Sequence, residues 1–212
     1  MTTIHIRGII IKETQVGESD KYLTILTKDR GKLTIRARGS KNAKSKFITA
    51  QLFAYCDFVL YKGRGFYSLT QVELFESFYK LRIHYDNLML AYESLYIYDK
   101  HLPDTLEEEE SSDFLLLLIK TLKELCQNKI PPTLVLSIFK LKFLQLSGLS
   151  PTLQDTYILG LDTKIKVTKA SAYTINYIIE ADIKNLFTFT VDKETKQSLR
   201  DICELFMPKL EN

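Results

Sequence analysis

The hydrophobic period of this 212-residue chain changes near residue 80, and this change limits the folds that the chain can adopt. Up to about Glu76, apolar residues recur at every second position and glycines separate the runs, which is typical of short β-strands. Beyond residue 80 the spacing becomes about 3.6 residues, as in amphipathic helices. The pattern predicts an α+β protein, with a β-module at residues 1–79 and a helical domain at residues 80–212.

Five strand candidates occupy the first 80 residues, at positions 3–12, 22–27, 33–38, 51–61 and 66–73. Glycine-containing turns and one longer loop join them. Five short strands connected in this way match a small closed barrel such as the OB-fold. An open five-stranded sheet would give nearly the same pattern, so periodicity alone leaves both architectures open.

The third strand candidate lies in a basic run at residues 30–46, which holds seven Lys and Arg residues and no acidic residue. Residues 1–80 carry 14 Lys and Arg against 7 Asp and Glu, whereas residues 81–212 carry 15 against 19. The overall net charge of +3 therefore conceals a basic amino-terminal part. A basic surface on a small β-module indicates a polyanion partner, with nucleic acid as the first candidate. The alternative is a solvated lysine-rich loop that keeps a sheet edge soluble.

Alternation divides the third strand candidate into two faces. Leu33, Ile35 and Ala37 fall on the face that we expect to be buried, and cations fall on the face that we expect to meet solvent. With cations of the next loop and of the last hairpin, the predicted nucleic-acid-binding set is Lys32, Arg36, Arg38, Lys41, Lys44, Lys46, Lys62 and Arg64. Three aromatic residues nearby are candidates both for base stacking and for the barrel core: Phe47, Phe66 and Tyr67.

The helical part begins with a predicted helix at residues 81–101. The acidic run at residues 107–110 reads as a solvated loop that places negative charge ahead of the next helix. That helix, at residues 114–127, is apolar almost all round, which is typical of a buried helix, and its expected N-cap is Ser111 or Ser112. Such helices should pack together and against the barrel.

A third helix is predicted at residues 133–147, where a pair of prolines begins it and a glycine ends it. Alternating segments at residues 164–169 and 172–179 then predict a small β-rich insertion within residues 150–190. A last helix at residues 193–206 has an apolar face that we expect to pack back on the helical bundle.

Signatures of catalysis are missing from the sequence. It has no P-loop, no serine nucleophile elbow, and no paired carboxylates outside the acidic run. His5, His84 and His101 show no metal-ligand spacing, and the three cysteines include no C-x-x-C pair. An active site assembled from scattered residues stays open, but the pattern favours a protein that is not an enzyme and uses no metal or cofactor.

The same sequence favours a cytoplasmic location. An odd number of cysteines, three, argues against a disulfide framework and fits a reducing compartment. The amino terminus lacks the basic region and long apolar core of a signal peptide. The longest strongly apolar run, residues 114–119, is far shorter than the roughly 20 residues needed to span a membrane. We therefore expect a soluble, cytoplasmic protein.

Several stretches, taken in their order and spacing, resemble the bacterial recombination mediator family RecO. Residues 8–12 (GIIIK) and 17–21 (GESDK) are similar to the opening motif of the family, and residues 60–73 are similar to its glycine-containing strand pair. Residues 146–153 (LSGLSPTL) resemble the motif that begins its carboxy-terminal part. The resemblance implies an amino-terminal OB-fold, a helical middle, and a small carboxy-terminal element that in many members is a four-cysteine zinc site.

This chain departs from the family pattern at the zinc site. Thr156 and Leu159 stand where the first pair of thiolates would be, and residues 170–180 contain no cysteine. Structural zinc needs about four thiolate or imidazole ligands, so the zinc role does not carry over. We expect a degenerate, zinc-ribbon-like β insertion that packing alone holds together, through Tyr157, Ile158, Tyr173, Ile175 and Tyr177.

The resemblance implies a mediator of DNA repair and homologous recombination that associates with the nucleoid. Such a protein binds single- and double-stranded DNA, anneals complementary strands, and assists RecA loading together with RecR on DNA coated with single-strand binding protein. The helical part is a candidate site for the acidic carboxy-terminal tail of single-strand binding protein, with four available lysines: Lys120, Lys123, Lys140 and Lys142. The alternative is a non-catalytic scaffold that binds RNA or an acidic protein through its basic β-module.

Overall fold

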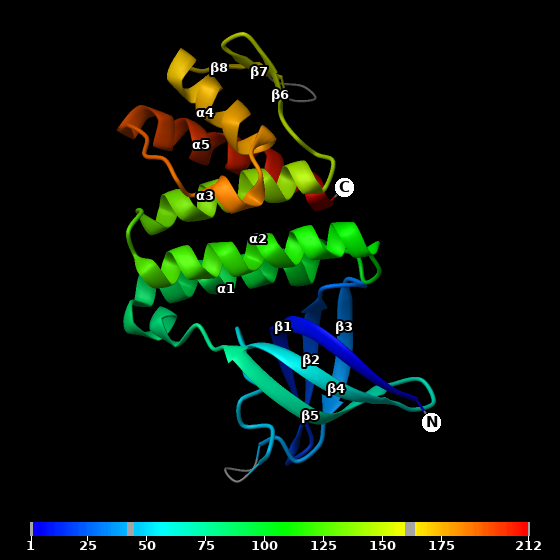
Figure 1. Ribbon diagram of the computed structural model, residues 1–212. Helices are drawn as coiled ribbons and strands as arrows, with labels where there is room; N and C mark the ends of the chain where they lie inside the picture. Colours follow the sequence, from blue (N-terminus) through cyan, green and yellow to red (C-terminus); the bar gives the residue numbers. More distant parts are fainter. Residues whose placement is uncertain (1, 42–44, 160–163, 212) are drawn as a thin grey trace. The chain divides into compact units, whose positions relative to one another are not determined.

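Five strands form a closed barrel in the computed structural model, which describes residues 2–41, 45–159 and 164–211 (Figure 1). The strands are β1 (Thr2–Val16), β2 (Asp20–Thr27), β3 (Lys32–Ala37), β4 (Tyr55–Lys62) and β5 (Tyr67–Glu76). Their order around the barrel is β1-β2-β3-β5-β4, and β1 pairs with β4 to close it. All neighbours are antiparallel except β3 and β5, which run parallel. The predicted OB-like barrel is confirmed, and the open sheet is excluded.

Alternate side chains of the strands fill the barrel, as the period of two predicts. The core includes Ile10, Leu23, Ile25, Ile35, Phe58, Leu60 and Leu69. Strand β1 serves two neighbours, and at Gly8 it pairs with Thr27 on one side and Cys56 on the other. A Cβ atom at Gly8 would collide with the Leu26 carbonyl oxygen. Glycine is therefore required where the two ladders meet.

The segment before β4 is a turn and not part of a strand. The sequence predicts a strand from residue 51, but β4 begins only at Tyr55. Phe53 has a φ angle of 73°, and its N–H donates to the Ile10 carbonyl at 3.0 Å. The Ile10 N–H in turn donates to the Ala54 carbonyl at 3.0 Å. These bonds to β1 fix a buried turn that residue alternation cannot distinguish from a strand.

The chain forms two compact units. The barrel unit consists of Met1–Lys80 with Leu95–Leu115, and the helical unit consists of Leu81–Ser94 with Leu116–Asn212. The first two helices contribute to both units, and they are α1 (Tyr85–His101) and α2 (Glu108–Gln127). The barrel unit therefore contains helical segments that come from beyond its five strands.

Within the barrel unit, Ser111 of α2 binds the turn between β2 and β3. Its buried hydroxyl accepts a hydrogen bond from the Gly31 N–H at 2.8 Å and donates one to the Thr27 carbonyl at 2.8 Å. Gly31 has a φ angle of 79°, and a Cβ atom there would lie 2.8 Å from the Asp104 carbonyl oxygen. The turn needs glycine both for its backbone conformation and for this close approach.

Helix α2 begins earlier than predicted. Glu108, Glu109 and Glu110 occupy its first turn, so the expectation of a solvated loop is wrong for these residues. Negative charge is favourable at a helix amino terminus, where the backbone N–H groups are unpaired. Ser111 lies inside the helix and uses its hydroxyl to bind the β2–β3 turn, so it is not the N-cap that the sequence predicts.

The helical unit contains three further helices and a small sheet. They are α3 (Pro132–Leu146), β6 (Thr152–Gln154), β7 (Tyr157–Leu159), β8 (Lys164–Lys166), α4 (Lys169–Glu180) and α5 (Lys193–Phe206). Short 3₁₀ helices occur at Tyr79–Ile83, Ile183–Asn185 and Met207–Glu211. Strands β6, β7 and β8 form an antiparallel sheet, and the bounds of α5 are those predicted.

The predicted strand at residues 172–179 is wrong, because these residues belong to α4. The Thr168 hydroxyl accepts a hydrogen bond from the Ser171 N–H at 3.1 Å and caps the helix. Ala172, Ile175 and Ile178 are buried at helical spacing. The N-cap is the signal that separates the two interpretations, because apolar residues at these positions also fit a strand.

Among the described residues, no helix is long and apolar enough to cross a bilayer.

Candidate nucleic-acid interface

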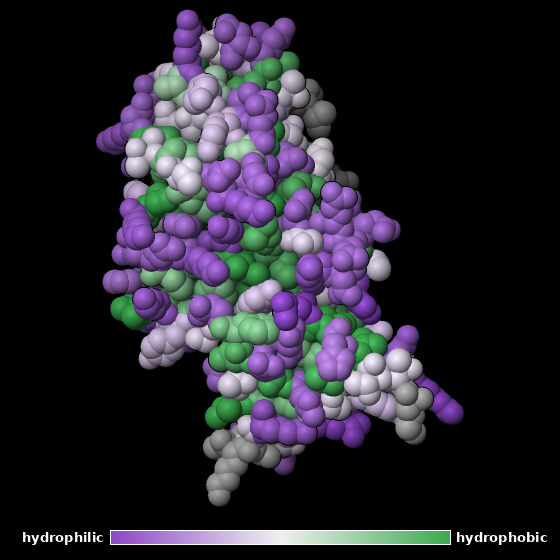
Figure 2. Space-filling model, in the orientation of Figure 1, coloured by the Kyte–Doolittle hydropathy of each residue, from purple (hydrophilic) through white to green (hydrophobic). Residues whose placement is uncertain are grey.

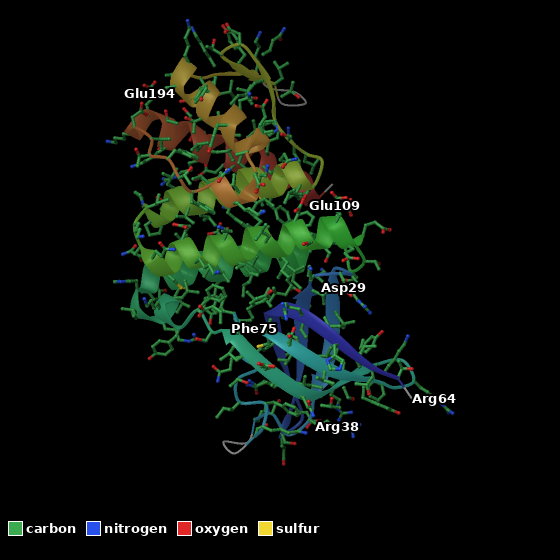
Figure 3. All side chains as sticks on the ribbon, in the orientation of Figure 1. Asp29, Arg38, Arg64, Phe75, Glu109 and Glu194 are labelled. Carbon is green, nitrogen blue, oxygen red and sulfur yellow. The ribbon has the colours of Figure 1, made fainter. Side chains whose placement is uncertain are left out.

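The β4–β5 hairpin carries two exposed cations beside two aromatic rings. Lys62 ends β4 and Arg64 lies in the turn, where Figure 3 shows it at the hairpin tip. The Lys62 ammonium lies 6.0 Å from the centre of the Tyr67 ring, and Phe66 is 44% exposed. In Figure 2 this projecting hairpin shows pale side chains of intermediate hydropathy, with hydrophilic ones toward its tip. The hairpin thus combines unpaired positive charge with a ring that a base can reach.

Arg30, in the turn between β2 and β3, lies close to the same hairpin. Its guanidinium binds Asp29 at 2.7 Å, and this carboxylate is the main cause of the raised pKa of Arg30. Tyr67 makes a smaller contribution in the same direction, which places the arginine near the start of β5. Sequence reasoning included Arg30 in the basic run but did not select it as a site residue.

At the other end of β3, Asp20 fixes the beginning of the basic loop. Its carboxylate accepts hydrogen bonds from the Gly39 N–H at 2.9 Å and from the Arg36 guanidinium at 2.8 Å. These bonds, with that from Gly39 the strongest, lower the pKa of Asp20. The Lys41 side chain donates to the Gly17 carbonyl at 3.0 Å. The β1–β2 turn therefore positions the loop that follows β3.

Four of the eight predicted cations are exposed and have no ion-pair partner within the described part of the chain: Arg38, Lys46, Lys62 and Arg64. Figure 3 shows Arg38 at the end of β3, apart from Arg64 at the hairpin tip. Lys41 is half-buried, and Lys44 lies outside the described residues. We call the four exposed cations the free cations. Arg38 and Lys46 belong to the segment that follows β3, whereas Lys62 and Arg64 belong to the β4–β5 hairpin.

Lys32 and Arg36 form hydrogen bonds and ion pairs within the barrel unit. The Lys32 side chain is only 10% exposed, and its ammonium lies 2.8 Å from the Asp99 carbonyl oxygen and 3.4 Å from the Asp104 carboxylate. The predicted exposure of Lys32 to solvent is therefore wrong, because the end of α1 covers the start of β3. Arg36 does point outward from β3, but Asp20 neutralises it.

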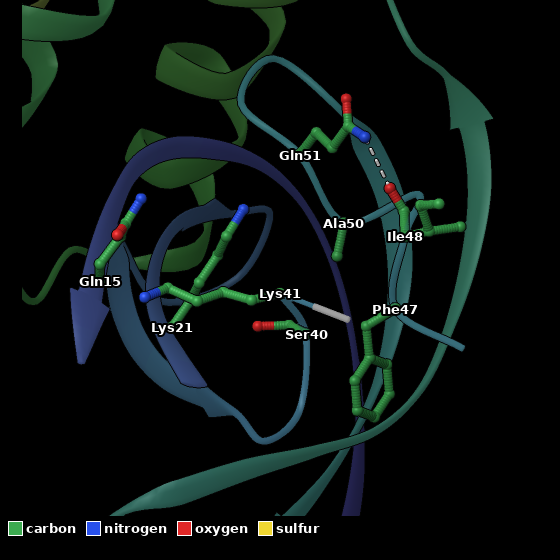
Figure 4. Close-up of a pocket in the computed structure, with 8 residues that line it drawn as sticks. All are labelled: Gln15, Lys21, Ser40, Lys41, Phe47, Ile48, Ala50 and Gln51. Carbon is green, nitrogen blue, oxygen red and sulfur yellow. Dashed lines mark hydrogen bonds between the residues drawn. The ribbon is translucent and has the colours of Figure 1, made fainter. Parts of the chain in front are cut away.

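A cavity of about 420 Å³ opens between the β1–β2 hairpin and the turn that precedes β4 (Figure 4). Its lining consists of Gln15, Lys21, Ser40, Lys41, Phe47, Ile48, Ala50 and Gln51. Phe47 is only 5% exposed and belongs mainly to the barrel core, whereas Ile48 is 52% exposed. Apart from Lys41 and Phe47, these residues could not be selected from the sequence, because an isolated glutamine or serine carries no motif.

The four lysines predicted for the helical unit do not share one surface. Lys142 is buried, and its ammonium donates to the Ile179 and Ala181 carbonyls at 2.8 and 2.9 Å, which satisfies the end of α4. Lys140 forms an ion pair with Glu93. Lys123 is exposed on α2 and Lys120 is half-buried there. The structure therefore contradicts a role for Lys142 at an exposed rim.

The small sheet and α4 are held by side-chain packing among the residues described. Ile158 and Ile175 are fully buried, and the Tyr177 ring packs edge-on against Phe189 at 5.2 Å. Tyr157 lies beneath the Lys164 ammonium at 4.1 Å. Tyr173 is 76% exposed, so the predicted packing role of this residue is wrong. In the described residues, no group of three or more His, Cys, Asp or Glu side chains could hold a metal ion.

Comparison with known proteins gives matches along both parts of the chain. The family model for "Recombination protein O N terminal" matches residues 1–78, and that for "Recombination protein O C terminal" matches residues 104–208. DNA repair protein RecO of Acetivibrio thermocellus is 27% identical over 232 residues, covering 98% of this chain and 91% of that protein. The protein of that name in Alkaliphilus metalliredigens is 27% identical over 231 residues, covering 96% and 92%. DNA repair protein RecO of a Thermoanaerobacter species is 30% identical over 168 residues, covering 78% of this chain and 66% of that protein.

Proposed function

Because the chain belongs to the RecO family of DNA repair proteins, we propose that its barrel, residues 1–79, binds the phosphate backbones of single- and double-stranded DNA through the free cations. The observation that carries this proposal is that four cations, in the segment after β3 and in the β4–β5 hairpin, are exposed and have no ion-pair partner among the described residues. Neighbouring cations such as Lys32 and Arg36 are neutralised within the fold. The charge available to a ligand is thus concentrated on the loop and the hairpin.

Backbone binding of this kind depends on salt. Each phosphate that is neutralised releases counterions, and four such contacts to a single strand predict a slope of about −3 for log K against log salt. Binding at 200 mM salt should then be roughly 50-fold weaker than at 50 mM. Such contacts carry no sequence information, and this suits a protein that must bind any strand.

We further propose that the protein anneals complementary strands and, with RecR, assists RecA loading on DNA coated with single-strand binding protein. Two strands repel each other through their phosphates, and a surface with cations on two separate segments can neutralise both. The acidic tail of single-strand binding protein is a proposed partner of the helical unit, where Lys120 and Lys123 on α2 are the remaining candidates. Titration with a tail peptide would refute this contact if no binding appeared.

We infer that the protein acts in the cytoplasm, on the nucleoid, as a mediator and not as an enzyme, without a cofactor. Two of its three thiols support the absence of cysteine catalysis, because burial raises the pKa of Cys56 and of Cys203 to about 12. A thiol with such a pKa stays protonated at neutral pH and is a poor nucleophile. Incubation of labelled DNA with the purified protein should leave the strands uncleaved.

The deciding experiment neutralises the free cations together: Arg38→Gln, Lys46→Gln, Lys62→Gln and Arg64→Gln. The annealing rate should fall by at least about tenfold, and the salt slope should approach zero. A matched control removes four exposed cations of the helical unit and should preserve both values: Lys169, Lys184, Lys193 and Arg200. Equal losses in the two variants would refute the proposed surface.

Competition between RNA and DNA distinguishes DNA binding from the alternative function, a scaffold for RNA or an acidic protein. Single-stranded RNA of equal length should displace bound single-stranded DNA no better than DNA itself does. A clear preference for RNA would favour the alternative.

A further inference from the structure

The first part of helix α1, residues 85–94, exposes its large apolar side chains and buries small or polar ones. The buried side chains of this stretch are Asn87, Ala91 and Ser94. The exposed ones include Tyr85 at 72%, Met89 at 46% and Tyr92 at 45%. A helix at the surface of a protein normally has the opposite arrangement, with its apolar face toward the core. An exposed apolar face of this kind marks a site of contact with another molecule.

These three exposed residues, which we call the α1 stripe, follow one line along the helix. Their spacing of four and then three residues places them on one face. Tyr92 lies about 10 Å from Tyr85 along the helix axis. Ile83, which precedes the helix and is 64% exposed, extends the apolar surface beyond Tyr85, because both residues line the same cavity.

This second cavity has a volume of about 410 Å³ and lies at the start of the α1 stripe. Its apolar lining includes Ile83, Tyr85 and Pro132, and its polar lining includes His84, Asp86 and Asn128. The Asn87 side chain donates to the Leu125 carbonyl at 2.8 Å and to the Asn128 side-chain oxygen at 3.3 Å, which fixes this end of α1 against the end of α2. An apolar wall beside hydrogen-bonding groups suits a tyrosine, whose ring is apolar and whose hydroxyl needs a partner.

The charges around the α1 stripe and the cavity do not favour a strongly charged ligand. Acidic and basic side chains both occur there, namely Arg82, Asp86, Glu93 and Lys129. Glu93 also forms an ion pair with Lys140. Electrostatic complementarity selects partners of the opposite charge, so neither DNA nor an acidic tail gains much from this surface. A second copy of the same chain is compatible with it.

The exposed apolar area is large enough for the interface of a dimer. With about 200 Å² for a fully exposed side chain of this size, Ile83 and the α1 stripe expose roughly 400 Å². Somewhat more than half of a typical interface is apolar, so this patch corresponds to roughly 700 Å² on each partner. Specific interfaces bury about 800 Å² on each partner. One copy therefore supplies about the area that a stable dimer needs.

We propose that two copies of this chain associate through the α1 stripe, with the two helices antiparallel about a two-fold axis at Met89. A two-fold interface is self-complementary, so one surface must carry both the projecting group and the cavity that receives it. The α1 stripe meets this condition, because Tyr92 and the cavity beside Tyr85 lie on opposite sides of Met89 along one helix face. Tyr92 of each copy enters the cavity of the other, and the two Met89 side chains meet at the axis.

This arrangement also predicts how association depends on salt. Asp86 of one copy comes near the partner's Glu93, and the ion pair of Glu93 with Lys140 reduces the repulsion between the two acids. Salt screens what repulsion is left and does not weaken apolar contacts. The dimer should therefore be at least as stable at about 200 mM salt as at about 50 mM, whereas DNA binding should weaken.

Sedimentation velocity without DNA tests the proposal, so its outcome is independent of the proposed DNA binding. The wild type should sediment as a dimer at about 50 μM, because interfaces of this size give micromolar or tighter association. Met89→Lys places two like charges at the axis, and Tyr92→Ala removes the group that fills each cavity. Each change should weaken association by at least about tenfold. Far-UV circular dichroism should be unchanged, because both residues are exposed.

Tyr173 provides the matched controls, because it is 76% exposed on α4 and lies outside the α1 stripe and its cavity. Tyr173→Lys and Tyr173→Ala introduce the same residues on another exposed surface of the helical unit. Both variants should sediment as the wild type does.

A disulfide cross-link tests the position of the axis. Met89→Cys should give a covalent dimer under mild oxidation, because the two copies of this residue meet. The wild type, whose Cys126 is half-buried, and Tyr173→Cys provide the background and should give none.

Four results would overturn the assignment. One is a wild type that stays monomeric at about 100 μM. Another is a dimer that survives both Met89→Lys and Tyr92→Ala, and a third is a dimer that Met89→Cys does not cross-link, since each would place the interface on another surface. The fourth is a dimer that dissociates as salt rises, because ion pairs and not the α1 stripe would then hold it.

Discussion

Replacement of Ser111 by alanine should destabilise the barrel unit, because one buried hydroxyl satisfies two backbone groups there. The hydroxyl accepts from the Gly31 N–H and donates to the Thr27 carbonyl, each at 2.8 Å, and Ser111 is fully buried. A buried polar group left without a partner costs about 1–3 kcal/mol. With two groups affected, the free energy of unfolding should fall by about 2–4 kcal/mol. For a chain of this length the midpoint of thermal unfolding should fall by roughly 5–15 °C.

Unfolding in urea should be followed by far-UV circular dichroism. The chain has 12 tyrosines but no tryptophan, so it lacks the side chain whose fluorescence usually reports unfolding. Ser112→Ala is the matched control, since Ser112 is the next residue of α2 and is only half-buried. That variant should change the free energy of unfolding by no more than about 0.5 kcal/mol. Hydrogen exchange localises the effect, because the Gly31 amide should exchange faster in Ser111→Ala than in the wild type.

Two results would refute the reasoning. One is a loss of stability below about 0.5 kcal/mol in Ser111→Ala, which would mean that the two backbone groups find other partners at no cost. The other is an equal loss in both serine variants, which would trace the effect to helix propensity and not to the turn.

Three further changes test other parts of the fold. Gly31→Ala should cost more than Gly17→Ala in urea unfolding, because both have positive φ angles but only Gly31 is crowded; equal costs would contradict this. Ile175→Ala should cost about 2–5 kcal/mol and Tyr173→Ala less than about 0.5, and similar losses would show that packing does not hold the insertion. The pKa of Asp20 is lowered by a backbone N–H and a guanidinium, so its carboxylate stabilises the fold above the ordinary carboxyl pKa near 4. The stability difference between wild type and Asp20→Asn should therefore shrink as the pH falls below about 4, and a constant difference would refute this.

The sequence predicted the barrel because alternation and glycine turns are local signals. The bounds of α5 were also readable, since its apolar face and its polar beginning both lie within a few residues. The errors have a common cause. Alternation shows which side chains of β3 face the core, but it does not show that the end of α1 covers Lys32. The cap at Thr168 and the role of Ser111 likewise depend on contacts that periodicity does not report.

The candidate site was predicted only in part, for a similar reason. Charge composition located the loop and the hairpin, and both carry exposed cations. Composition could not show that Asp20 neutralises Arg36. The two residues are 16 positions apart in the sequence, and their pairing depends on the register between β2 and β3. The glutamines of the cavity were missed because their meaning comes from the surface around them and not from their own chemistry.

The parallel junction between β3 and β5 affects how the barrel loses its fold. Strands β3 and β5 are joined only at Ile35–Tyr67 and Arg36–Ser68, whereas the other junctions run along most of their strands. Loosening this seam would turn two protected strands into open edges, and open edges recruit other chains. Destabilising substitutions near it should therefore lead to aggregation before the hydrophobic interior is lost.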